Sequence, residues 1–296
     1  MNAALVLMAY GSPERLADVP AYYADIRGGR PVPPEHLEDL VERYRRLGIE
    51  AESPLNAITE QTRAALEREL RLPVFTGMKH WQPRIADAAD RVLAAGAEAV
   101  VGLVLAPHYS ELSIAGYREQ LEGALEGRAE LVFVDSWHDE PGFVELLADR
   151  IRGTGAHVVF TAHSLPERVL VLGDPYKEQL LDTAQLVASA AGVDDRWSFS
   201  FQSESPTGEP WLGPDILDHL EELRARGVRS VLVCPVGFVA DHLEIRWDLD
   251  HEAAEKAREL DIEFARIEMP NAEPAFVSVL ARLVRQRLAA SLAMPR

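Results

Sequence analysis

Residues 230–236, with the sequence SVLVCPV, form a largely apolar run that leads into residues 238–252, FVADHLEIRWDLDHE. A short, Val-rich run of this kind predicts a buried β-strand. The segment that follows predicts a helix with carboxylates at Glu244, Asp248 and Glu252. A spacing of four residues places neighbouring side chains on one face of a helix. This stretch therefore indicates an α/β protein with a row of acids beside the end of a strand.

The same alternation of strand and helix signals runs through the whole chain. Apolar runs predict strands at 3–9, 74–78, 99–105, 131–135, 157–162, 197–201, 230–236 and 262–266. Helical patterns fall at 19–26, 35–47, 58–70, 83–95, 113–125, 143–152, 177–191, 216–226, 241–260 and 274–292, with a loop at 27–34 and a turn at 53–56. Such alternation favours parallel sheets with helices on both faces, a doubly wound, Rossmann-like arrangement.

The two halves of the chain echo each other in sequence. Residues 8–13, MAYGSP, correspond to residues 161–166, TAHSLP, and residues 105–108, LAPH, correspond to residues 233–236, VCPV. We expect two similar domains that face each other across a cleft, with Tyr10 and His163 on opposite walls. The expected boundaries are 1–150 plus 272–296 for the first domain, whose last helix returns to it, and 151–271 for the second.

Composition excludes several classes of protein. The chain has 296 residues, 47% of them apolar, and a formal charge of −18, so a nucleic acid partner is not expected. The single cysteine, Cys234, excludes an internal disulfide framework and a cysteine-ligated iron–sulfur cluster. No apolar run reaches the roughly 18 residues of a membrane span, and no secretion signal opens the chain, which predicts a cytoplasmic location. Dinucleotide and phosphate-loop motifs are also missing.

Two interpretations fit the acidic row. Carboxylates on a helix often form only a solvated face. Here, however, the row follows a strand of an α/β unit, where such proteins place ligands, and its neighbours are apolar. His163, at the end of the strand at 157–162, could be structural, or it could meet Glu244 over the edge of the sheet. An imidazole and a carboxylate suit a divalent first-row metal, or proton removal.

Further polar residues follow strands of the first half, namely Lys79, His80 and His108. Basic residues and a tyrosine also cluster at Arg27, Arg30 and residues 43–46, RYRR. In so acidic a chain this cluster suggests a substrate with carboxylates. The alternative is ion pairing along one helix with Glu38, Asp39 and Glu42.

With these residues in view, the chain resembles the ferrochelatases nearly from end to end. The motifs that carry the resemblance are MAYGSP (8–13), YY (22–23), SPL (53–55), GMKH (77–80), LAPH (105–108), AHSLP (162–166), QSE (202–204), PWLGP (210–214) and GFVADHLE (237–244). Within that family the chain is most similar to the bacterial coproporphyrin III ferrochelatases. The resemblance implies the chelatase-type version of the two-domain fold and a soluble monomer that inserts Fe²⁺ into coproporphyrin III to form coproheme.

The resemblance also implies roles for individual residues. His163 and Glu244 match the catalytic pair of the inner metal site, and Tyr10 matches an axial ligand of the product iron. Asp248 and Glu252 match an outer metal site, which could take Mg²⁺, or a path for metal and protons. Residues that match positions lining the porphyrin are Tyr10, Arg27, Arg43, Tyr44, Ser53, Lys79, His80 and Tyr117.

The resemblance has exceptions and limits. Residues 48–52, GIEAE, are longer than the usual segment before SPL, which puts the contact of Ser53 in question, and Gly28 stands where relatives often have arginine. Many actinobacterial members bind a 2Fe–2S cluster, which one cysteine excludes, so we expect no tightly bound cofactor and Fe²⁺ only as substrate. Coproporphyrinogen oxidase or coproheme decarboxylase could dock transiently.

Three other functions stay open at this stage. The first is insertion of iron into protoporphyrin IX, and the second is insertion of cobalt or nickel into a sirohydrochlorin-type ring. The third is a porphyrin or haem carrier without catalysis, which needs only one axial ligand rather than the pair His163 and Glu244. The spacing of the acidic row makes one structural prediction as well. A regular α-helix would displace Glu252 from Glu244 by about 80°, so three acids along one path require a wider, π-like turn.

Overall fold

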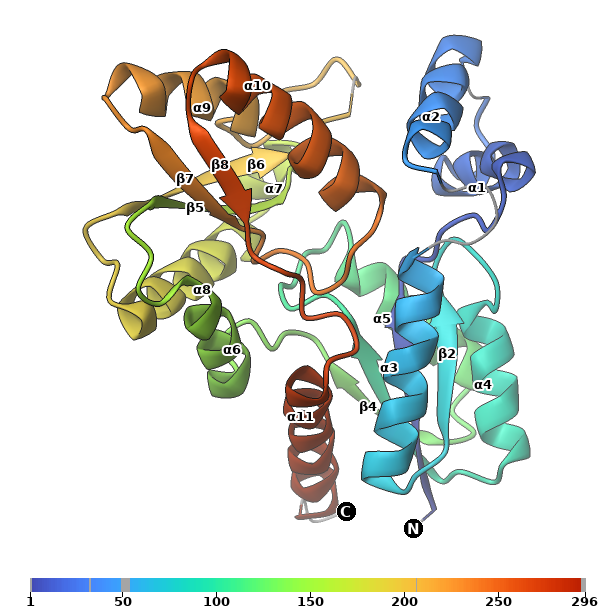
Figure 1. The fold of residues 1–296 in the computed structure, drawn as a ribbon. Helices are drawn as coiled ribbons and strands as arrows, with labels where there is room; N and C mark the ends of the chain where they lie inside the picture. The colour runs from blue at the N-terminus through green and yellow to red at the C-terminus, as the bar shows by residue number, and fades with distance from the viewer. Residues whose placement is uncertain (1, 32, 49–53, 206, 294–296) are drawn as a thin grey trace.

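The computed structural model describes residues 2–31, 33–48, 54–205 and 207–293 (Figure 1). It contains two four-stranded sheets in which all neighbouring strands are parallel. The first sheet has the order β2-β1-β3-β4 and the second the order β6-β5-β7-β8. The sheets have the same topology, and helices flank both of them. The predicted α/β class with two similar doubly wound sheets is therefore confirmed.

The strands of the two sheets are close to the predicted ranges. They are β1 (Ala3–Ala9), β2 (Val74–Met78), β3 (Ala99–Val104), β4 (Glu130–Val134), β5 (His157–His163), β6 (Trp197–Gln202), β7 (Ser230–Cys234) and β8 (Glu263–Arg266). The inner strands β1, β3 and β5 are almost entirely buried, as their continuous apolar runs require, and β7 buries Val231, Val233 and Cys234. Strand β7 stops two residues earlier than predicted, because Pro235 has no N–H to donate to a ladder.

The helices connect the strands in the expected alternation. They are η1 (Leu16–Asp18), α1 (Val19–Ile26), α2 (Pro34–Arg46), α3 (Pro54–Leu70), α4 (Ile85–Ala94), α5 (Ile114–Leu125), α6 (Pro141–Ile151), α7 (Arg168–Val171), α8 (Tyr176–Ala191), α9 (Ile216–Ala225), η2 (Ile245–Ala253), α10 (Ala254–Glu259) and α11 (Pro274–Ala293). The predicted turn at 53–56 is wrong in its described part, because α3 begins at Pro54, where a proline suits the first turn of a helix. None of the helices in the described ranges is long and apolar enough to span a bilayer.

One large apolar core joins the two halves. It includes Leu5 and Leu103 of the first sheet, Phe160 of the second, and Phe276 and Leu280 of α11. Helix α11 packs against α3 and α6, and Figure 1 shows it below the second sheet and beside the first, at the end of the molecule where both chain termini lie. Smaller cores cover the outer faces of the two sheets. The two halves are thus joined through a shared core.

The last helix returns to the first sheet, as its place after residue 272 predicts. Helix α11 contacts β3 and β4 as well as α3. The predicted boundary at residue 150 falls at the end of α6, which packs against α8 and β7 of the second half. The packing thus ties α6 to both halves, and the domain boundary remains a prediction.

The sequence echo between the halves corresponds to structure at the first strand of each sheet but not at the third. In the first sheet Met8 pairs with Val104. Thr161, the counterpart of Met8, lies just beyond the last pair of β5 with β7, Phe160 with Cys234. By position in the sheet, the counterpart of Val104 would therefore be Pro235, the residue after Cys234. The sequence echo instead aligns Val104 with Leu232, which lies three residues before Pro235. Parallel sheets of equal topology can therefore share a site edge without sharing every register.

Candidate active site

The candidate site lies at the carboxyl end of β5 in the second sheet. Strand β5 ends at His163, and the chain leaves β7 at Cys234 to pass over β5 before the acidic helix. Gly237 allows this crossing, because a Cβ there would lie 2.6 Å from the Cβ of Ala162. The Gly237 N–H donates to the carbonyl of Thr161 at 3.2 Å. The crossing places the start of the acidic helix directly beside His163.

His163 and Glu244 are in direct contact. Nδ1 of His163 lies 2.9 Å from Oε2 of Glu244, and each side chain remains 33% exposed. Burial alone would raise the pKa of the Glu244 carboxyl, but the imidazoles of His163 and His242 lower it well below its usual value. Glu244 is therefore a carboxylate that can only accept, so Nδ1 of His163 carries the proton of this hydrogen bond. In the neutral imidazole, Nε2 is then free to accept a proton or bind a metal.

The charge of Glu244 also acts back on His163. Burial favours the neutral imidazole, yet the carboxylates of Glu244 and Asp248 raise the pKa of His163 above its usual value. The buried Tyr176 donates its hydroxyl to the carbonyl of His163 at 2.9 Å, and the Trp211 ring lies edge-on, 6.4 Å away. The imidazole is thus held from its backbone, its ring nitrogen and one side of its ring.

Asp248 lies deeper in the protein than Glu244. Its side chain is 7% exposed, and it accepts hydrogen bonds from the hydroxyl of Ser203 and from Nε2 of Gln202, the latter at 3.4 Å. Burial and the nearby charge of Glu244 raise the pKa of Asp248 to about 7. Glu252, the last acid of the row, is half-buried and also raises this pKa. Neutral pH therefore divides Asp248 between its two protonation states.

The helix that carries these acids is a π-helix from Ile245 to Ala253. The wider turn expected from the acidic row is therefore present. The predicted single helix over 241–260 is corrected to η2 followed by α10. π-helical segments are rare and are frequently found at functional sites. Its other face packs Ile245 and Leu249 into the core of the second sheet.

Tyr10 and His80 stand at the end of the first sheet. Their ring centroids are 4.6 Å apart, and the backbone N–H of His80 donates to the carbonyl of Tyr10 at 2.9 Å. Nδ1 of His80 lies 2.9 Å from Asp25, which also accepts from Arg84. Tyr10 remains 42% exposed, while the surrounding protein and then the charge of Glu244 raise its pKa. The hydroxyl of Tyr10 therefore lies within electrostatic reach of Glu244.

Lys79, beside Tyr10, is held in place by the first half itself. Its ammonium group donates to the carbonyl of Ser113 at 2.9 Å and lies 4.8 Å from the ring centre of the buried Tyr117. Burial lowers the pKa of Lys79. The structure therefore brings Lys79 and Tyr117 into contact, so the two residues belong to the same surface of the first half.

Helices α1 and α2 carry or adjoin the residues predicted to line the porphyrin, and α2 brings them to the second half. Tyr44 is buried, its hydroxyl lies 3.2 Å from that of Ser12, and it packs in a small cluster that includes Leu243. The guanidinium of Arg43 lies 5.3 Å from the ring centre of Trp247 on η2. Arg27 lies over the Tyr23 ring, and its buried Nε has no hydrogen-bond partner among the residues that the structure describes. Ser53 lies outside the described residues.

The remaining predicted residues, Arg45, Arg46 and His108, have partners outside the candidate site. Arg45 and Arg46 both pair with Glu42, so ion pairing along the helix accounts for their contacts in α2. His108 is buried against Thr183 at 2.9 Å and holds the two halves together, and burial lowers its pKa to about 3. Tyr176, Ser203 and His242 are site neighbours that the sequence did not single out. Ser203 and His242 lie within quoted motifs, at 202–204 and 237–244, whereas Tyr176 lies in none of them.

The donor set suits a transient metal ion. His163 and Glu244 contribute one nitrogen and one carboxylate, and Nε2 of His242 lies 3.8 Å from Glu244. Within the described ranges no group of three or more His, Cys, Asp or Glu side chains could hold a metal ion. One imidazole nitrogen and one carboxylate oxygen are donors that suit a divalent first-row metal.

Comparison with known proteins gives a consistent result. The family model for ferrochelatase matches residues 2–288. A ferrochelatase from Herpetosiphon aurantiacus is 44% identical, with 96% of this chain and 98% of the relative aligned. A coproporphyrin III ferrochelatase from Halalkalibacterium halodurans is 41% identical, over 96% of this chain and 97% of the relative.

Solved structures with similar folds include two proteins of low sequence identity. SirB from Bacillus subtilis, solved with Fe³⁺, gives a TM-score of 0.63 at 12% identity, over 99% of this chain and 98% of the other. CbiX, described as the terminal enzyme of siroheme biosynthesis in denitrifying bacteria, gives 0.53 at 13% identity, over 97% and 99%. These structures share the chelatase fold. Together with the site and the family match, they lead to one conclusion: this chain belongs to the ferrochelatase family, enzymes that insert a metal into a porphyrin.

Proposed function

We propose that this ferrochelatase inserts Fe²⁺ into coproporphyrin III, with His163 and Glu244 as its catalytic pair. The observation that carries the site assignment is the 2.9 Å contact between Nδ1 of His163 and Glu244 at the end of β5. It leaves Nε2 of a neutral imidazole as the available base or metal ligand. Relatives at about 40% identity that are named coproporphyrin III ferrochelatases support the choice of substrate.

The reaction requires three events. Two pyrrole N–H protons leave the ring, the ring puckers so that its nitrogen lone pairs reach the metal, and Fe²⁺ loses bound water. In this proposal His163 binds the arriving ion or accepts a pyrrole proton at Nε2, while Glu244 stabilises the charge that develops on the imidazole. A given nitrogen can do one of these at a time, so binding and proton transfer follow one another.

Asp248 and Glu252 extend the proposal away from the inner pair. A carboxyl with a pKa of about 7 can both take and release a proton near neutral pH, as Asp248 requires for a relay. In the proposal, protons taken by His163 pass along η2 through Asp248 toward Glu252. The same acids could take Mg²⁺ as an outer site. A divalent ion there would lower the pKa of Asp248. A role of these acids as a proton relay and a role as an outer metal site therefore predict opposite effects of added Mg²⁺ on the rate of iron insertion.

Tyr10 holds the opposite side of the ring in this proposal. It stands on the other half of the molecule and is exposed to the space that Glu244 faces. Lys79, Tyr117, Arg43, Arg27 and Tyr44 then surround the ring and its carboxylates. Arginine forms strong paired hydrogen bonds with carboxylates, so the rim suits a porphyrin with more propionates than protoporphyrin has.

The decisive experiment compares substrates under anaerobic conditions. We expect the rate of Fe²⁺ insertion, followed in the Soret band, to give a kcat/KM at least tenfold higher for coproporphyrin III than for protoporphyrin IX. Sirohydrochlorin with Co²⁺ or Ni²⁺ should give no turnover above background. Equal use of the two porphyrins would refute the substrate assignment while leaving the reaction intact. Porphyrin binding without rate enhancement would favour a carrier.

A further inference from the structure

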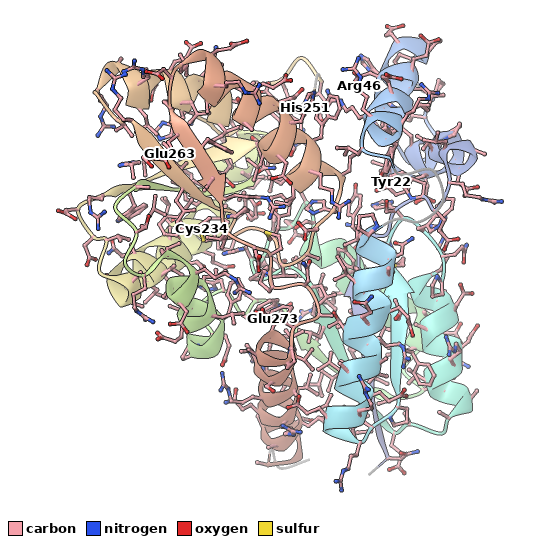
Figure 2. The ribbon with its side chains drawn as sticks, in the orientation of Figure 1. Tyr22, Arg46, Cys234, His251, Glu263 and Glu273 are labelled. Atoms are coloured by element: carbon pink, nitrogen blue, oxygen red, sulfur yellow. The ribbon has the colours of Figure 1, made fainter. Side chains whose placement is uncertain are left out.

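A pocket lies in the seam between α2 and the π-helix η2. Its volume is about 340 Å³, and it opens between the first half of the molecule and the second. The residues that line it are Arg46, Leu47, Arg246, Trp247, Asp250 and His251. Figure 2 labels Arg46 and His251, which come from the two helices that face each other across this seam. None of these six residues has a role in the proposed iron chemistry.

The pocket has more positive charge than its own acids neutralise. Among the residues that the structure describes, the guanidinium of Arg246 has neither an ion-pair nor a hydrogen-bond partner. Arg46 shares the single carboxylate of Glu42 with Arg45. Asp250, the one acid in the lining, already pairs with Arg266 at 2.6 Å. In a chain of charge −18 this local excess of cations stands out.

Trp247 adds an unsatisfied donor. The residue is 7% exposed, and its indole Nε1 is buried without a hydrogen-bond acceptor in the described part of the chain. Its ring lies between Arg43, 5.3 Å away, and His251, whose ring centroid is 4.6 Å away. Buried N–H groups are nearly always paired, and leaving one unpaired is costly. The lining thus brings donors from both helices, while its one carboxylate, Asp250, is already paired with Arg266.

We infer that this pocket binds a small oxyanion, a carboxylate or a phosphate. Such an anion would pair with Arg246, accept from the groups around it and connect α2 of the first half to η2 of the second. Two sources supply this chemistry, either a free anion in solution or a carboxylate of a porphyrin whose rim reaches past Arg43. The second source rests on the proposed function, whereas the first does not.

Calorimetric titration of the metal-free full-length chain with inorganic phosphate, and separately with citrate, tests the site itself. Arg246→Gln should weaken the binding of the tighter anion by about tenfold or more, as expected for the loss of one charge-assisted contact. Arg258→Gln is the matched control, because Arg258 is exposed on α10, outside the pocket, and also has no described ion pair. We expect its affinity to stay within about twofold of the parent chain. Trp247→Phe, which keeps an aromatic ring but removes the indole N–H, should weaken binding several-fold.

Coproporphyrin III binding, measured by quenching of tryptophan fluorescence without iron, separates the two sources. If a porphyrin carboxylate fills the pocket, Arg246→Gln weakens porphyrin binding about tenfold and citrate competes with the porphyrin. If a free anion fills it, porphyrin affinity is unchanged and citrate binds beside the porphyrin. The inference is overturned if neither phosphate nor citrate binds the parent chain and Arg246→Gln leaves porphyrin affinity unchanged. Because every readout is binding, failure of iron insertion would not imitate either result.

Discussion

The two sheets end in walls that share topology and differ in charge. On the first wall, Tyr10 follows the last β1–β2 pair, Ala9 with Met78, and so stands beside Lys79. On the second wall, His163 pairs directly with Gln202 at the end of β5 and β6. The first wall thus carries a tyrosine and a lysine, while the second carries an imidazole and, from η2, two carboxylates.

The difference lies in where each charge is balanced. Lys79 and His80 are engaged within the first half, by the carbonyl of Ser113 and by Asp25, so both groups of that wall already have hydrogen-bond partners. On the second wall, burial and then the charge of Glu244 raise the pKa of Asp248 to about 7. A wall of crowded carboxylates beside a histidine attracts cations and takes up protons, whereas a wall of satisfied groups holds a ring. In the proposed function, one fold used twice therefore separates chemistry from binding.

The largest expected effect is the loss of the imidazole. His163→Ala should lower the rate of Fe²⁺ insertion by about a thousandfold, because it removes the group that accepts protons or binds the metal. Porphyrin affinity should change by less than about threefold, since the first wall is untouched. Soret absorption measures both quantities. Turnover within tenfold of the parent enzyme would exclude His163 from the chemistry.

Replacing the partner of that imidazole should have a smaller effect and a distinctive pH dependence. Glu244→Gln should reduce the rate by about a hundredfold. The charge of Glu244 raises the pKa of His163, and protonated His163 can neither accept a proton nor bind metal. Removing that charge lowers the pKa, so the acid limb of the pH–rate profile should move to lower pH. A limb that stays in place or moves to higher pH would contradict the pairing.

Asp248 should affect stability rather than binding. The pKa of about 7 in the folded state exceeds the ordinary value of 3.8 for an aspartate carboxyl, so the native state holds this proton more tightly than the unfolded state. Its contribution to stability is therefore fully present below about pH 4 and is lost as pH rises through 7. Asp248→Asn should raise the free energy of unfolding at pH 8 by on the order of 2 kcal/mol and change it little at pH 4.

Denaturant unfolding at the two pH values measures this difference. Asp250→Asn is the control on the same helix, since Asp250 is exposed and paired with Arg266. That variant should be neutral or slightly destabilising at pH 8. If Asp248→Asn destabilises the protein equally at both pH values, the picture of crowded carboxylates on the second wall is wrong.

The smallest effect concerns how His163 is held. Tyr176→Phe removes the hydroxyl that donates to the His163 carbonyl at 2.9 Å, a neutral hydrogen bond worth about 1 kcal/mol. We expect kcat to fall several-fold while KM for porphyrin stays constant. Steady-state kinetics separates the two. A rise in KM without loss of kcat would show that Tyr176 supports the binding wall instead.

The sequence predicts the sheets well because their strands carry long apolar runs that only burial can explain. The meeting of His163 and Glu244 was also predictable, since both follow strands whose carboxyl ends lie on one edge. The turn at Pro54 was misassigned, because proline suits both turns and first helical residues. The spacing of acids called for a wider turn, and η2 provides it.

What the sequence could not reveal were the contacts that cross from one element to another without periodicity. Tyr176 reaches the carbonyl of His163 from α8, and Ser203 reaches Asp248 from the end of β6. Neither contact leaves a spacing in the sequence, because both depend on how separate elements pack. The same holds for the pairing of Arg43 with Trp247, which joins α2 to η2.

In the proposed function, the wall of His163 carries out the chemistry and the wall of Tyr10 binds the ring. The most direct test measures kcat for anaerobic Fe²⁺ insertion, at saturating coproporphyrin III, in His80→Ala beside His163→Ala. Each change removes one histidine that bonds to a carboxylate, one from each wall. We predict that His80→Ala keeps kcat within about tenfold of the parent enzyme, at least a hundredfold above His163→Ala. Equal losses in the two variants would contradict the account.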